Sequence, residues 1–292
     1  MNAYRYCGRL FSEDEIQLIR RLIHCHPQAH RADLSRLVCR SLPWLRPDGR
    51  LKDMSCRVAM IRMHNDGLIN LPAPLCKNGN GRHRPVITRA SDPQAPICLG
   101  AGQLGPLTFL PVQRREDSLL YNEFIRRYHY LGYKPLTGAQ KRYLVFAGKQ
   151  LLALLGFGAS AWQIADRDRF IGWTREQRKR NLQLVVNNAR YLILPWVKCH
   201  NLASHILSLA AKRLPDDWQQ QYGYRPVLLE TFVHKDRFRG TCYRAANWLH
   251  VGQTTGRGKL GGHRSRLPIK HVFLYPLSRN FRRILTGERS PC

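Results

Sequence analysis

The chain has 292 residues, and its 48 lysines and arginines outnumber its 19 aspartates and glutamates to give a formal net charge of +29. It contains no apolar run near the roughly 20 residues that a membrane helix needs and no signal-peptide core, so we expect a cytoplasmic protein without membrane contact. Nine cysteines without a Cys-x-x-Cys pair argue against a zinc site or a disulfide framework. The excess of positive charge predicts a polyanionic partner, and DNA is the expected one.

The positive charge is spread along the whole chain. Residues 1–90 hold 16 basic and 7 acidic side chains, and residues 91–292 hold 32 and 12. Because both parts are basic, we expect both to lie along the same nucleic acid. The alternative is a basic protein of the ribosomal type, whose charge is simply solvated.

Residues 1–90 carry three helical patterns followed by a hairpin pattern. The helices are expected at residues 12–25, where Ser12 and Glu15 form a capping box, and at residues 31–42 and 52–65. In the third helix we expect Met54, Val58 and Ile61 to face inward, and a basic-tipped hairpin is expected over residues 75–88. This order predicts a winged helix-turn-helix domain that binds duplex DNA, with a small helical protein-interaction module as the alternative. The residues expected to contact the duplex are Lys52, Arg57, Arg62, Lys77 and Arg82.

Residues 91–115 are rich in proline and glycine and are interpreted as a linker to a second domain, residues 116–292. In that domain the apolar periodicity predicts helices and strands in an α+β order. The expected elements are a helix at 116–128, strands at 142–147 and 151–157, a strand at 190–196, a helix at 202–214, a strand at 227–233, a short helix from 240, and strands at 249–252 and 272–275.

Glu230 interrupts the nearly continuous apolar run of the strand at 227–233. A buried carboxylate needs a partner, because an unpaired buried charge costs several kcal/mol. One hypothesis joins Glu230 to Asp166 and Asp168 around Mg²⁺ or Mn²⁺, as in a metal-dependent nuclease or transposase. The alternatives are structural: an exposed ion-pair cluster for the two aspartates, and Arg190 or Arg244 as the buried partner of Glu230.

His129, which lies between two tyrosines in an expected loop, is the candidate general base if the chemistry needs no metal. Asn187 and Asn188 precede a buried strand and are expected to line one cleft with Arg190 and Arg244. Trp248 or Tyr243 would there stack on an unpaired base. The core residues expected to bind DNA are Arg178, Lys179, Arg180, Arg190, Arg244, Trp248, Arg257 and Lys259.

Several stretches of the second domain are similar in sequence to a known protein family. They are RYHYLGY (127–133), LLALLGFGASAW (151–162), FIGW (170–173), VVNNARYLILPWVKCHNLASHIL (185–207) and LLETFVHKDRFRGTCYRAANW (228–248). Over residues 117–285 the chain resembles the Druantia anti-phage system protein DruA family. The resemblance implies a prokaryotic defence or mobile-element module, with DNA and other defence proteins, including a helicase, as partners.

The order of elements in the second domain is also similar to that of GNAT acyltransferases, with residues 190–196 and 227–233 in place of their central splayed strands. This resemblance implies a GNAT-like core. In those enzymes a glycine-rich loop binds the pyrophosphate of acetyl-CoA, whereas the equivalent residues 197–201 contain no glycine. We therefore expect a DNA-binding defence component first, a metal-dependent nuclease or transposase second and an acyltransferase third, with no cofactor other than the metal ion of the second.

Overall fold

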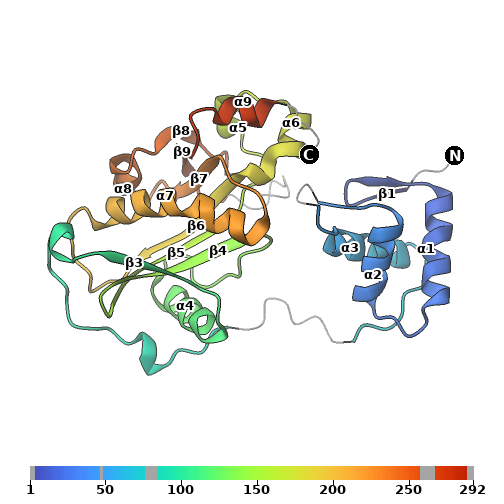
Figure 1. Cartoon of the computed structure of the whole chain (residues 1–292), viewed down its shortest axis with the longest axis horizontal. Helices are drawn as coiled ribbons and strands as arrows, with labels where there is room; N and C mark the ends of the chain where they lie inside the picture. Colours follow the sequence, from blue (N-terminus) through green and yellow to red (C-terminus); the bar gives the residue numbers. More distant parts are fainter. Residues whose placement is uncertain (1–3, 47–48, 76–83, 257–266, 288–292) are drawn as a thin grey trace. The chain divides into compact units, whose positions relative to one another are not determined.

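The computed structural model describes residues 4–46, 49–75, 84–256 and 267–287. The chain divides into two compact units, Met1–Asn80 and Gly81–Cys292 (Figure 1). None of the helices in the described residues has both the length and the apolar character that crossing a bilayer requires.

The N-terminal unit is a short hairpin followed by three helices. Its elements are β1 (Tyr4–Tyr6), β2 (Arg9–Phe11), α1 (Glu13–Cys25), α2 (Arg31–Ser41) and α3 (Asp53–Asn65). The capping box predicted from the sequence is confirmed: the Glu15 amide donates to the Ser12 hydroxyl at 3.2 Å, and the Ser12 amide donates to the Glu15 carboxylate at 3.2 Å. All three helices match their expected ranges within a residue or two.

Helix α3 buries a different face from the expected one. Cys56, Ala59, Met60 and Met63 are buried, whereas Met54 is 54% exposed and Val58 40% exposed. The inward orientation predicted for Met54 and Val58 was therefore wrong, because the face of Cys56, Ala59, Met60 and Met63 packs in the core cluster that holds Leu34 and Val38 of α2.

The hairpin expected over residues 75–88 is not seen in its described part. Residues 84–88 form no strand, and the hairpin of this unit, β1–β2, precedes the helices. The expected wing residues Lys77 and Arg82 lie outside the described residues. Of the other expected contacts, Arg62 is exposed, while Lys52 and Arg57 are half-buried and Arg57 lies 3.8 Å from Asp53.

The second unit is built on a seven-stranded mixed sheet with the order β3-β4-β5-β6-β7-β9-β8. The strands are β3 (Leu107–Pro111), β4 (Gln140–Ala147), β5 (Gln150–Ala159), β6 (Val185–Ile193), β7 (Leu228–His234), β8 (Leu249–Gln253) and β9 (Lys270–Pro276). The expected linker over residues 91–115 is corrected here, since β3 pairs with β4 along the edge of this sheet. The proline at its end, Pro111, is tolerated because an edge strand has one row of unpaired backbone groups.

The one parallel pair of this sheet, β6 with β7, separates after a short contact. Its register joins Val185 to Leu228, Val186 to Leu229 and Asn187 to Glu230, and the two strands are not paired beyond that point. The strand expected at residues 190–196 begins five residues earlier than predicted, at Val185, because Asn187 and Asn188 interrupt its apolar pattern.

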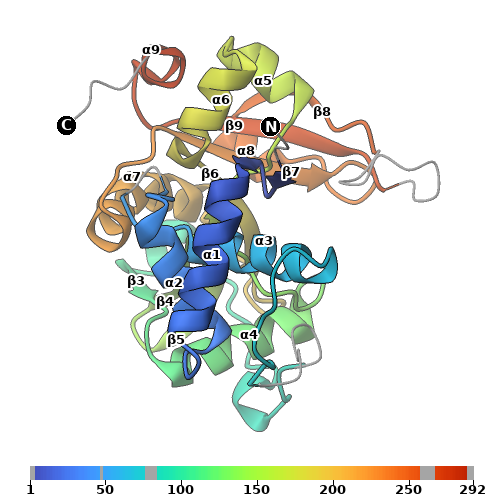
Figure 2. The ribbon, with the colours of Figure 1, turned by 90° about the vertical axis from the view of Figure 1, so that its right-hand side faces the viewer.

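Helices cover both faces of the sheet. Adjacent residues of β4 show this: Arg142 bonds to Asn122 of α4, whereas Tyr143 bonds to Asp217 of α7. The helices are α4 (Arg115–Tyr128), α5 (Ala165–Ile171), α6 (Arg175–Asn181), α7 (Leu202–Tyr222), α8 (Thr241–Ala245) and α9 (Phe281–Thr286). Helices α5, α6 and α9 gather at the β8–β9 end of the sheet (Figures 1 and 2). Helix α7 continues through Pro215 and is longer than the expected 202–214.

Candidate functional site

A cavity of about 550 Å³ opens where β6 and β7 separate. Its walls come from six parts of the chain: the loop after α4, β6 from Asn187 onward, the start of α7, the end of β7 with the loop that follows it, the start of α8, and the start of β9. The cavity exists because the two strands diverge, so neither backbone fills the space between them. Of the residues singled out in the sequence, the structure brings His129, Asn187, Asn188, Arg190 and Tyr243 together here.

The lining of this cavity is strongly cationic. Arg190, Arg237, Arg239 and Lys270 all line it, and no aspartate or glutamate of the described residues does. Burial lowers the pKa of both Arg190 and Lys270, since little solvent remains to stabilise their charges. Cations held in partly desolvated surroundings without a carboxylate attract an anionic ligand.

Arg190 is held in place by carbonyl groups. Its Nη1 donates to the carbonyl oxygen of Ala189 at 2.7 Å and its Nη2 to that of Lys134 at 3.4 Å. Among the residues that the structure describes, its buried Nε has no hydrogen-bond partner and no carboxylate pairs with the guanidinium. The group is thus positioned but not neutralised.

A hydrogen-bonded network forms one side of the cavity. The Tyr243 hydroxyl donates to Asn188 Oδ1 at 2.7 Å, and the Thr231 hydroxyl donates to the Asn188 carbonyl oxygen at 3.0 Å. Burial raises the pKa of Tyr243 well above its ordinary value, so its hydroxyl stays protonated. Tyr243 therefore acts as a fixed donor and not as a nucleophile.

His129 is 7% exposed and lines the cavity. Its Nδ1 accepts the amide hydrogen of Leu131 at 3.2 Å, and its ring stacks on Tyr130 at a centroid distance of 4.9 Å. Burial, reinforced by the charge of Arg190, lowers the pKa of His129 to about 4. The imidazole is therefore neutral at pH 7.

The buried His129 should make the stability of the protein sensitive to acid. The unfolded chain protonates this imidazole near pH 6.5, but the folded chain does so only near pH 4. Stability from this group is complete above pH 6.5 and falls as the pH drops towards 4, by about 3 kcal/mol. Denaturant unfolding at pH 7 and pH 4 should show a smaller acid-induced loss in His129→Gln than in the wild type; an equal loss would contradict the lowered pKa.

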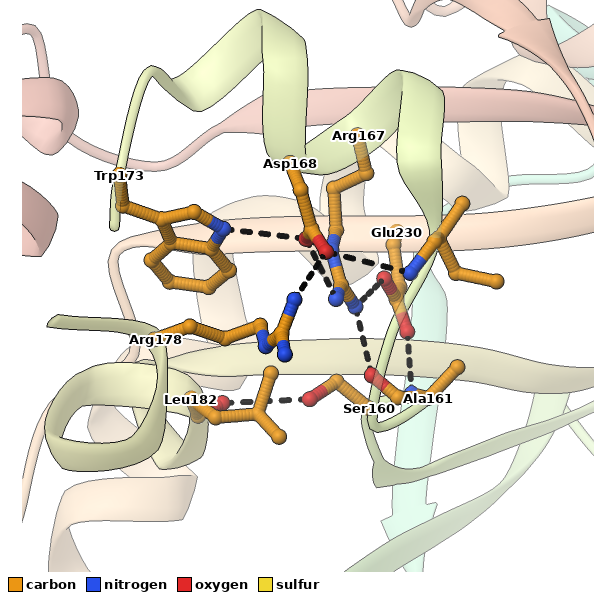
Figure 3. Close-up of polar contacts among 9 residues, drawn as sticks. Ser160, Ala161, Arg167, Asp168, Trp173, Arg178, Leu182 and Glu230 are labelled. Atoms are coloured by element: carbon orange, nitrogen blue, oxygen red, sulfur yellow. Dashed lines mark hydrogen bonds and ion pairs between the residues drawn. The ribbon is translucent and has the colours of Figure 1, made fainter. Parts of the chain in front are cut away.

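The acidic candidates form a separate, closed network (Figure 3). Glu230 is 0% exposed. Its Oε2 accepts from Arg167 Nη1 at 2.8 Å, and its Oε1 accepts from the Ala161 amide at 2.8 Å. Burial raises the pKa of Glu230, while the adjacent guanidinium of Arg167 opposes this shift. Both carboxylate oxygens are therefore occupied.

The same network engages Asp168. Its Oδ1 accepts from Arg167 at 2.7 Å and from the Trp173 indole at 3.0 Å, and its Oδ2 accepts from Arg178 at 2.8 Å. Arg167 thus bridges Glu230 on β7 to Asp168 on its own helix, α5 (Figure 3). The network ties α5 and α6 to the sheet.

The hypothesis of a metal site built on these acids is not supported. Asp166 Oδ2 accepts from the Gln253 amide at 2.7 Å and its Oδ1 pairs with Arg169 at 3.0 Å, so it does not converge with Glu230. In the described ranges no group of three histidines, cysteines or acids is arranged to hold a metal ion. The alternative of a buried ion pair for Glu230 fits the structure, with Arg167 in the place expected for Arg190 or Arg244.

The remaining expected DNA-binding residues have different environments. Lys179 and Arg180 are exposed on α6, and the guanidinium of Arg244 lies 5.6 Å from the ring centroid of Phe273. Trp248 is 3% exposed, so it packs in the core and cannot stack on a base, contrary to the prediction. Arg257 and Lys259 lie outside the described residues.

Arg237, Arg239 and Lys270 line the cavity but were not predicted from the sequence. The tripeptide Arg237–Arg239, an aromatic residue between two arginines, was a usable signal, since such interleaving is typical of nucleic-acid-binding surfaces. Lys270 had no comparable signal, because only the fold brings β9 beside the cavity.

A family model described as Druantia protein DruA matches residues 62–265. None of the curated proteins compared with the chain matches it. Among solved structures, a chimera of spermidine N-acetyltransferase SpeG from Vibrio cholerae and hSSAT has a TM-score of 0.37 at 11% identity, covering 59% of this chain and 95% of that one. The ribosomal-protein-S18-alanine N-acetyltransferase of Escherichia coli has a TM-score of 0.36 at 8% identity, with coverages of 59% and 95%. An N-acetyltransferase from Staphylococcus aureus Mu50 has 0.36 at 10%, with 59% and 99%. These scores are too low to carry an argument about this chain.

Proposed function

The chain belongs to the Druantia protein DruA family, and from this membership together with the cationic cavity we propose that it is a DNA-binding component of a prokaryotic anti-phage defence system. Membership of the family supports the defence role. A helicase and other defence proteins would then be its protein partners, and DNA its ligand.

The observation that carries the DNA proposal is the charge of the cavity lining. Four cationic side chains, Arg190, Arg237, Arg239 and Lys270, line one cavity, and its walls contain no acidic residue in the part of the chain that the structure describes. Arginine and lysine in such an arrangement bind the phosphates of a nucleic-acid backbone. A formal net charge of +29 over the whole chain would draw DNA towards this site.

The N-terminal unit supplies a second contact in this proposal. Its three helices would dock on duplex DNA as a helix-turn-helix, with α3 in the major groove. Arg62, which is exposed on α3, would contact phosphate or a base edge, and the neighbouring Met54 and Val58 would meet thymine methyl groups. Lys52 and Arg57 would lie at the edge of this surface.

Binding of single-stranded DNA to the full chain should depend steeply on salt. For four phosphate contacts, at about 0.7 per contact in the logarithmic slope, a fourfold rise in salt should weaken binding about 50-fold. Fluorescence anisotropy with a labelled oligonucleotide measures this. The double variant Arg190→Gln/Lys270→Gln should bind more weakly and lower the slope by about 1.4.

The matched control for this experiment is Lys149→Gln, which removes a positive charge from the exposed β4–β5 turn, outside the cavity lining. It should leave affinity nearly unchanged. If the wild-type chain bound neither duplex nor single-stranded DNA at low salt, the proposed function would be wrong.

A further inference from the structure

The loop between β7 and α8 carries an exposed aromatic ring at the cavity. The amides of Arg237 and Phe238 donate to the His234 carbonyl oxygen at 3.2 and 2.9 Å, which closes a turn. Gly240 ends the loop at φ +69°. Phe238 lies in this turn and is 46% exposed. An arginine precedes it and another follows it in the sequence.

The aromatic rings around the cavity differ in how much of their surface is already used. Tyr130 stacks on His129, and the guanidinium of Arg237 lies 5.3 Å from its ring centroid. Phe238 meets Tyr130 in a T-shaped contact at 5.1 Å and keeps almost half of its surface exposed. Within the described part of the lining, Phe238 therefore offers the exposed aromatic surface beside the cations.

Two lining residues have buried polar atoms that could meet a ligand. Asn187 Oδ1 and Arg190 Nε have no hydrogen-bond partner within the described ranges, one an acceptor and the other a donor. A buried polar atom without a partner costs free energy, which a ligand with matching groups would recover. The volume of about 550 Å³ falls in the roughly 300–1,000 Å³ range of sites for small molecules.

An aromatic surface, flanking arginines and unpartnered polar atoms together match the chemistry of one nucleotide. We propose that the cavity accepts a single unpaired nucleotide of a DNA strand, whose base stacks on Phe238 and whose phosphates contact Arg237 and Arg239. A base in a duplex is stacked on both faces and paired along one edge, so only a base of single-stranded DNA or an extruded base can enter. This inference rests on the proposed DNA binding and adds which part of DNA the cavity recognises.

The test compares Phe238→Ala with the wild-type chain on a short single-stranded oligonucleotide and on an abasic oligonucleotide of the same length. Loss of stacking on one base, about 1–3 kcal/mol, should weaken binding of the normal strand about 5- to 150-fold. Binding of the abasic strand and of a blunt duplex should not change. Phe238→Trp should retain affinity, because indole stacks at least as well.

The controls separate stacking from folding and from overall charge. Trp162→Ala removes another aromatic side chain, 55% exposed and outside the cavity lining, and should not alter affinity. The melting temperature of Phe238→Ala should fall only slightly, since the side chain is 46% exposed and its ring contact is with Tyr130 at the cavity.

Other outcomes would refute either the nucleotide cavity or its assignment to a DNA strand. If the wild-type chain binds DNA but Phe238→Ala binds the normal strand equally well, the nucleotide cavity is refuted while DNA binding stands. If the wild-type chain binds normal and abasic strands equally well, the nucleotide cavity is likewise refuted while DNA binding stands. If free deoxyadenosine monophosphate competes as well as a dinucleotide does, the site takes a free nucleotide and its assignment to a DNA strand is wrong.

Discussion

Replacing Arg167 with methionine is expected to lower the free energy of unfolding by about 3–5 kcal/mol. Arg167 is 0% exposed and pairs with both Glu230, also 0% exposed, and Asp168. The substitution keeps the apolar stem but leaves the Glu230 carboxylate buried without a cation. Breaking a buried pair costs much more than the pair itself contributes, because desolvation of the remaining charge is no longer compensated.

Denaturant unfolding of matched variants measures this effect. Arg169→Ala is the control, because Arg169 lies on the same helix and pairs with Asp166 but is 79% exposed. It should cost less than about 1 kcal/mol. The double variant Arg167→Met/Glu230→Gln should recover part of the loss, since it removes the stranded charge. A loss below about 1 kcal/mol for Arg167→Met alone would show that the pair is not buried in solution.

Gly240→Ala is expected to lower the free energy of unfolding by about 2–4 kcal/mol. A Cβ at this position would lie 2.6 Å from Phe273 Cζ and 2.7 Å from its Cε2, and the ring is fully buried. The backbone φ of +69° adds strain for any residue with a side chain. The loop that carries Phe238 would shift with it, so binding of single-stranded DNA should also weaken.

Gly223→Ala is the matched control for the backbone term. Gly223 has φ +79°, but a Cβ there would meet nothing within 4 Å. Its replacement should cost only about 1 kcal/mol, from conformation alone. Thermal and denaturant unfolding of the two variants compare the costs directly, and equal losses would contradict the predicted clash with Phe273.

Apolar periodicity predicted most of the regular elements of the second unit. Helix α4, the β4–β5 hairpin and strand β7 appear within a few residues of their expected ranges because their buried positions are continuous or regularly spaced. Strand β3 was missed because prolines obscure an edge strand, and the start of β6 was missed because Asn187 and Asn188 break its apolar run. In both, tertiary position overrides local composition.

The site was harder to predict than the fold. The sequence grouped Asn187 and Asn188 in one cleft with Arg190 and Arg244, and the structure places the first three, but not Arg244, in the described lining of one cavity. The exposed ion-pair cluster considered for Asp166 and Asp168 did not indicate that Arg167, which lies between them, is buried, because this burial depends on Glu230, 63 residues away. No local pattern reports a partner at that separation.

The short contact between β6 and β7 makes the sheet two half-sheets joined at one end. Three residue pairs link them, whereas β7 and β9 pair along their whole length. Side chains hold the halves together beyond that junction, with Leu192 of β6 and Val233 of β7 packed in the same core cluster as α7. The angle between the half-sheets, and with it the width of the cavity mouth, is therefore set by the volumes of buried residues. Substitutions in this core can alter which ligands enter the cavity without changing any residue that a ligand touches. Related proteins can therefore differ in ligand preference through changes in buried residues alone.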